Sequence, residues 1–131
     1  MKFQLFLGLL LVLFLVSCDP MQTIEIENKS DHTSVVKFFF TGEGYYKFDE
    51  FLTKDSLIVN LDSGEVKAFY FGIGTWEVHN SLDSLASRID RIEVESGKSA
   101  EVFDNDYQVE SFFRDRLVDD RYRARIIVEL E

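Results

Sequence analysis

The residues of this 131-residue chain that could do chemistry are its carboxylates, two histidines and one cysteine. Asp104-x-Asp106-x-Gln108 begins with the oxygen spacing of a calcium-binding loop. Such a loop needs glycine at its sixth position and a bidentate glutamate at its twelfth. Val109 and Asp115 stand at those positions. Asp104 and Asp106 are therefore weak metal candidates, and the sequence assigns the protein neither a metal nor a cofactor.

Two glycine-containing segments carry fragments of nucleotide-binding motifs. Residues 96–99, Ser-Gly-Lys-Ser, end like a phosphate loop, but Ile92 stands where that loop needs its first glycine. Gly72-x-Gly74 opens like a dinucleotide-binding turn, but Glu77 occupies the position of the third small residue. We interpret residues 96–99 as a tight turn between two strands and Gly72-Ile73-Gly74 as the end of a strand.

The usual catalytic arrangements are missing from the sequence. His32 and His79 are the only histidines, and neither has a second histidine or cysteine two to four residues later. The chain has no G-x-S-x-G turn, and its many carboxylates include no pair that the spacing singles out for hydrolysis. An enzyme is the least favoured function, and we assign no catalytic residue.

Three aromatic residues fall near expected loops. Tyr45, Tyr46 and Trp76 could stack on a sugar or anchor a protein contact there. The alternative is that these rings cover the open ends of the hydrophobic core. We keep the three as candidate ligand-binding residues, chiefly Tyr46 and Trp76, with a glycan or another small molecule as the ligand.

The single cysteine follows an apolar segment near the start of the chain. Lys2 supplies a positive charge, residues 5–16 carry no charge, and Ser17 and Cys18 follow. An apolar run of this length after a positive start is typical of an export signal, and it is too short for the ~20 residues of a transmembrane helix. Because no second cysteine exists, an intramolecular disulfide is excluded.

Leu15-Val16-Ser17-Cys18 resembles the bacterial lipobox, with an apolar residue at −3, a small residue at −1 and cysteine at +1. The resemblance implies diacylglycerol on the Cys18 thiol, cleavage between Ser17 and Cys18, and usually acylation of the new amino terminus. Two or three acyl chains hold a protein stably at a bilayer, whereas one binds marginally. The alternative is an ordinary signal cleaved near Asp19.

The lipobox resemblance also predicts where the protein resides. A lipoprotein belongs to the cell envelope, with the membrane bound through its N-terminal lipid. Asp19 resembles an inner-membrane retention signal of some diderm bacteria, but other lineages do not follow that rule, and we favour the outer membrane.

Cleavage before Cys18 divides the chain into three parts. Residues 1–17 form the signal, 18–22 the lipidated cysteine and a short tether, and 23–131 one domain. Loss of Lys2 changes the net charge from −10 to −11, because the signal contains no acidic residue. Such a surface repels nucleic acid and anionic lipid head groups. A protein partner in the envelope is therefore expected, and nucleic acid is not.

Hydrophobic residues recur with a period of two along most of the domain, which is the signature of strands. Strands are expected at residues 23–27, 34–41, 56–61, 65–73, 91–95, 99–103 and 122–130. Residues 34–41 carry apolar side chains on both faces, which favours a central strand. Residues 56–61 and 65–73 flank Asp62-Ser63-Gly64, and we predict that they pair as a hairpin.

Helical spacing is limited to two short segments. Leu82, Leu85, Ala86 and Ile89 recur at the spacing of a helix face, and Asn80 is a suitable N-cap. Residues 104–120 are polar apart from Phe112 and Phe113 and are expected to hold another helical turn.

These elements predict an all-β fold, an antiparallel β-sandwich of six to eight strands with one or two short helices. The pattern loosely resembles the immunoglobulin-like and transthyretin-like modules of envelope lipoproteins, although the cysteine pair and core tryptophan position of antibody domains are missing. The favoured function is a non-enzymatic, lipid-anchored envelope lipoprotein that acts as an interaction or accessory module. The alternative is a binding module for a glycan or small ligand.

Overall fold

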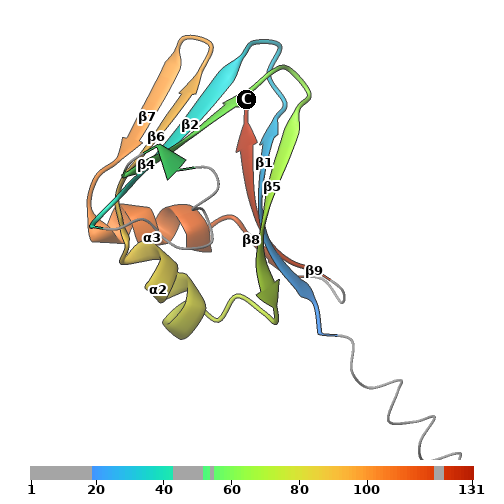
Figure 1. Cartoon of the computed structure of the whole chain (residues 1–131). Helices are drawn as coiled ribbons and strands as arrows, with labels where there is room; N and C mark the ends of the chain where they lie inside the picture. The colour runs from blue at the N-terminus through green and yellow to red at the C-terminus, as the bar shows by residue number, and fades with distance from the viewer. Residues whose placement is uncertain (1–18, 43–51, 54, 120–122) are drawn as a thin grey trace, which may run out of the picture.

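A computed structural model describes residues 19–42, 52–53, 55–119 and 123–131, and these residues form two packed sheets (Figure 1). One sheet has the strand order β5-β1-β9-β8 and the other the order β3-β4-β2-β6-β7. The all-β sandwich predicted from the sequence is confirmed. The strands are β1 (Met21–Asn28), β2 (Ser34–Phe40), β3 (Leu52–Thr53), β4 (Ser56–Leu61), β5 (Val66–Ile73), β6 (Ile89–Ser96), β7 (Ser99–Phe103), β8 (Leu117–Asp119) and β9 (Arg123–Leu130).

The core lies between the sheets and is supplied by alternate residues of each strand. In β9, Ala124, Ile126, Val128 and Leu130 are buried and the residues between them face outward. In β2, the side chains of Val36, Phe38 and Phe40 are buried, while those of the intervening residues are half-buried. The position of β2 between β4 and β6 confirms that it is a central strand. The period of two therefore identifies both the strands and their inward faces.

β4 and β5 do not form the hairpin that the sequence predicts. β4 pairs with β2 and β3, whereas β5 pairs with β1 in the other sheet. Residues 62–65 therefore form an arch that carries the chain across the core. Gly64 has a φ of 75°, as a tight turn requires, but the same turn chemistry suits a crossing between sheets. The β6–β7 pair, by contrast, is a hairpin as expected.

The first and last strands of the domain lie side by side and run parallel. β1 pairs with β9 from Met21–Arg123 to Asn28–Leu130, and with β5 on its other side. The expectation of a purely antiparallel sandwich is wrong for this one pair, because local alternation carries no information on strand direction. β1 also begins at Met21, inside the expected tether, so that only Asp19 and Pro20 separate it from Cys18.

Two helical segments fill the end of the sandwich where β1 begins (Figure 1). The first consists of a π-helical turn, η2 (Val78–Leu82), which continues as α2 (Asp83–Ala86). Asn80 is not its N-cap, because it lies inside η2, where its amide is 3.4 Å from the Glu77 carboxylate. The second segment, α3 (Asp106–Arg114), confirms the helical turn expected there and buries Phe112 and Phe113 in the core.

At the opposite end of the sandwich, a buried amide connects the two segments that cross between the sheets, residues 29–33 and residues 62–65. The Asn28 side chain is 0% exposed, and its Nδ2 donates to the main-chain oxygens of His32 at 2.7 Å and Leu61 at 3.1 Å. Its Oδ1 accepts from the Ser30 hydroxyl at 2.7 Å and the Ser34 hydroxyl at 3.1 Å. The amide therefore forms hydrogen bonds both with the segment between β1 and β2 and with the last residue of β4.

We predict that Asn28→Ala lowers the free energy of unfolding by about 2–3 kcal/mol, because the buried Leu61 carbonyl and Ser34 hydroxyl each lose a hydrogen bond to the amide. Asn60→Ala is the matched control, since the Asn60 side chain is exposed and its loss should cost at most about 0.5 kcal/mol. Urea unfolding followed by circular dichroism measures both. Equal effects of the two substitutions would contradict the role given to Asn28.

Candidate interaction surface

Trp76 belongs to the core and does not form a ligand platform. Its side chain is 4% exposed, and its ring lies 5.2 Å from that of Phe71. The indole Nε1 donates to the Thr23 carbonyl at 3.2 Å. Of the two interpretations of Trp76, core packing is therefore the right one, and stacking on a sugar is not. Tyr45 and Tyr46 lie outside the described residues.

Asp104 and Asp106 mark the start of α3. Asn105 is the N-cap, and its side chain accepts from the Gln108 main-chain N–H at 3.0 Å. The Gln108 side chain in turn accepts from the Asp104 main-chain N–H at 3.2 Å. This reciprocal bonding resembles a capping box, shifted by one residue. It gives the alternating polar spacing of residues 104–108 a structural reason that needs no metal.

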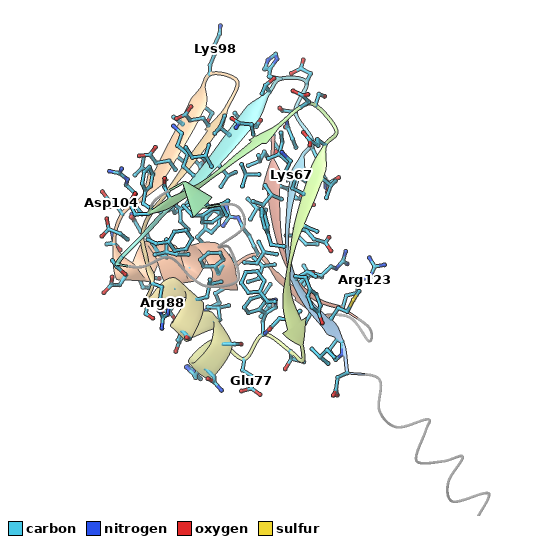
Figure 2. All side chains as sticks on the ribbon, in the orientation of Figure 1. Lys67, Glu77, Arg88, Lys98, Asp104 and Arg123 are labelled. Atoms are coloured by element: carbon cyan, nitrogen blue, oxygen red, sulfur yellow. The ribbon has the colours of Figure 1, made fainter. Side chains whose placement is uncertain are left out.

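The structure also shows where the phosphate-loop fragment and the two histidines lie. Residues 96–99 form the β6–β7 turn, where Gly97 has a φ of 57°. Lys98 points outward from the tip of this hairpin (Figure 2). His32 and His79 are exposed, each near one carboxylate. Within the described ranges, no group of three or more histidine, cysteine or acidic side chains is arranged to hold a metal ion.

Three hollows of the described surface share Arg116, the residue between α3 and β8. One of them, a cavity of about 310 Å³, lies between β7 and β9. We call this region the Arg116 groove. Its walls are Ser99 and Glu101 of β7 on one side and Val128 and Glu131 on the other, with Arg116 at its base.

Arg116 is held in place by its contacts and not by a paired carboxylate. Its Nη1 donates to the Phe112 carbonyl at 3.0 Å, and the guanidinium carbon lies 4.2 Å above the centre of the Phe112 ring. Burial lowers the pKa of Arg116, and the nearby Glu101 and Asp115 carboxylates oppose that shift. A guanidinium stacked on an aromatic face keeps its charge while losing much of its water.

Acidic side chains surround this one cation. Glu101, Asp115, Glu129 and Glu131 line the hollows that share Arg116. Glu129 is paired with Lys29, whose Nζ lies 2.5 Å from its carboxylate, so these four carboxylates face two cations, Arg116 and Lys29, and leave the groove with an excess of negative charge.

An apolar shelf continues the groove toward α3. Tyr107 is 73% exposed and Val102 is 52% exposed, although both side chains are large and apolar in their main body. Phe103, beside them, packs against Phe112 with ring centres 4.9 Å apart. Aromatic residues are enriched at the centre of protein interfaces, and charged residues are more typical of their rim.

The groove also lies between two incompletely paired strand edges. β7 is the last strand of its sheet, so its outer edge has no strand partner among the residues described. In the facing sheet, β8 pairs with β9 only from Ala124 to Ile126. One further bond, from the Ile127 N–H to the Arg116 carbonyl at 2.9 Å, closes this pairing. Beyond it, the edge of β9 opens into the groove.

Comparison with protein-family models, with curated proteins and with solved structures finds no match. None of the helices in the described segments is long and apolar enough to cross a membrane.

Sequence reasoning did not identify Arg116. It lies in a polar segment among several other charged residues, and no spacing distinguishes it from Arg114, two positions earlier. The signal that could have found it is its neighbour Phe112, four residues before it, because residues at this spacing share one face of a helix. Only the packing of β7 against α3 shows that the Arg116 side chain is half-buried.

We predict that Arg116→Ala lowers the free energy of unfolding by about 1–2 kcal/mol, because stacking on Phe112 and packing of the aliphatic stem are lost. Arg114→Ala is the matched control. Arg114 forms only an exposed ion pair with Glu110, worth at most about 0.5 kcal/mol. Urea unfolding compares the two variants, and a larger loss for Arg114→Ala would contradict the assigned contacts.

Proposed function

We propose that this protein is a lipid-anchored lipoprotein of the bacterial cell envelope that acts by contact with another protein and not as an enzyme. The observation that carries the anchor is the uncharged run 5–16 ending in Leu15-Val16-Ser17-Cys18. Signal and cysteine stand in the register that the lipobox requires. Acyl chains on Cys18 then supply membrane attachment to a domain whose surface is strongly acidic.

The start of the folded domain supports an anchor at Cys18. β1 begins at Met21, and the Pro20 carbonyl already accepts a hydrogen bond from the Gly74 N–H at 2.9 Å. At ~3.5 Å per residue, Met21 lies within about 10 Å of the acylated residue. The lipid therefore holds the domain close to the bilayer surface.

The Arg116 groove supports the second half of the proposal. It combines a hollow, an acidic rim, an exposed tyrosine and two incompletely paired strand edges. Such a combination serves recognition of another chain better than capture of a sugar. The burial of Trp76 also removes one of the three aromatic rings on which a glycan-binding function would depend.

We predict that Cys18→Ser abolishes incorporation of radiolabelled palmitate and leaves the uncleaved precursor, because the thiol that receives diacylglycerol is lost. Ser17→Ala is the matched control: it keeps a small residue before the cleavage site and should be labelled and cleaved normally. Gel mobility and membrane fractionation measure maturation. A Cys18→Ser protein that matures to the same mass and stays with the membrane would overturn the anchor.

We further propose the outer membrane as the location and predict that Asp19→Ser does not change the membrane distribution. Density-gradient separation of inner and outer membranes measures that distribution. If the wild-type protein is found in the inner-membrane fraction and Asp19→Ser moves it to the outer membrane, Asp19 is a retention signal and the proposed location is wrong.

A further inference from the structure

We propose that the Arg116 groove binds an extended, cationic segment of a protein partner, which adds as a strand to the free half of β9. This inference rests on the interaction role proposed above and is independent of the lipid anchor. It names the surface, the conformation of the bound segment and the sign of its charge.

The main chain of β9 presents hydrogen-bonding groups to the groove. Its residues alternate between two neighbours: Leu130 accepts from the Lys29 N–H of the β1 side, whereas Ile127 donates to Arg116 on the β8 side. Glu129 has the same parity as Ile127 and therefore faces the groove. No strand described in the structure lies opposite Glu129 on that side. Residues 128–131 thus offer an edge of about 13 Å for a fifth strand of this sheet. Within it the Glu129 N–H and carbonyl face the groove, whereas the Glu131 main-chain oxygen already accepts from the Ser96 hydroxyl at 2.9 Å.

The side chains beside this edge define the pattern of the bound segment. Residues paired across a sheet point to the same face. A residue opposite Glu129 would place its side chain on the outer face, near Glu129 and Glu131. Lys29 already pairs with Glu129 at 2.5 Å, so a lysine or arginine of the segment is favoured chiefly by Glu131. The neighbours of that residue in the segment would point inward, toward Val128 and Leu130 at the core. The segment should therefore alternate basic and apolar residues, and Glu101 across the groove adds to the attraction.

The other open side of the sandwich is protected against such pairing. There the edges of β4 and β5 face each other, and the Lys67 Nζ donates to the Asn60 carbonyl at 2.6 Å across the gap. Figure 2 shows Lys67 at the gap between the two sheets. An inward-pointing lysine on an edge strand is a known means of preventing edge-to-edge association. Between β7 and β9 the basic side chain that lines the gap is Arg116, and its guanidinium donates to the Phe112 carbonyl of α3 instead of to the main chain of either strand.

The first test uses the mature protein in non-ionic detergent and the peptide acetyl-Lys-Val-Lys-Val-Lys-Val-Lys-amide. At a peptide concentration ten times Kd, the Glu129 amide should exchange its hydrogen about tenfold more slowly, measured by NMR. The Leu130 amide is the internal control: it faces β1 and should not change. Binding without protection of Glu129 would overturn strand addition.

N-methylation of every second residue of the peptide distinguishes binding by strand pairing from binding by charge attraction alone. Methylating every second amide removes the donors of one edge of a strand and keeps all side-chain charges. Two such peptides, methylated on the lysines or on the valines, should differ, one binding and the other not. Equal binding of both would show that only charge is recognised and would overturn the proposal.

The site of binding is tested by a pair of matched substitutions. Glu101→Gln should weaken the unmethylated peptide about two- to fivefold, because it removes one exposed carboxylate from the groove. Glu77→Gln removes the same charge at the far end of the molecule and should have no effect (Figure 2). Equal losses would contradict binding in the groove. If the mature protein proves to carry no acyl chains and the peptide still protects the Glu129 amide, the lipid anchor is refuted and this inference stands.

Discussion

The buried amide of Asn28 is the interaction on which the arrangement of the two sheets depends. It stands at the end of β1, where the chain leaves one sheet for the other, and bonds to the end of β4, where the chain crosses back. The hydrogen-bond network continues from the Ser34 hydroxyl, which donates to the Ser96 hydroxyl at 3.0 Å, and the Ser96 hydroxyl donates to the Glu131 main-chain oxygen at 2.9 Å. A fully satisfied buried network fixes a single geometry, because any shift leaves a polar group unpaired.

Crossing between sheets, instead of pairing within one, determines where the open edges lie. Because β4 and β5 are joined by an arch, β5 and the part of β4 that β3 does not cover, residues 58–61, have edges without a strand partner among the residues described, on the same side of the sandwich. Lys67 fills that gap. On the other side, β8 covers only three residues of β9, since the chain leaves α3 and enters β8 only after Arg116. The groove therefore follows from the order of the strands, and its acidic side chains distinguish it from an ordinary open strand edge.

The sequence predicted the strands, because period-two alternation reflects burial of one face and depends only on neighbouring residues. It did not predict their partners. Asp62-Ser63-Gly64 suits a hairpin and an arch equally, and only the pairing of β5 with β1 decides between them. Trp76 and Arg116 show the same limit for the site. A tryptophan beside a loop suits a ligand platform and core packing alike, and only the burial of its ring decides between them. One arginine among several is distinguished only by its packing against Phe112.

The parallel pairing of β1 and β9 relates the groove to the proposed anchor. Met21 pairs with Arg123 and Asn28 with Leu130, so the free half of β9 lies at the end of the strand far from Cys18. Seven residues of strand at ~3.3 Å each place that end about 23 Å beyond Met21. With acyl chains on Cys18, the acidic groove would face away from the bilayer surface if β1 stands upright on it. In that arrangement the start of β1, next to the lipid, and the open edge of β9, available to a partner, lie at opposite ends of one sheet.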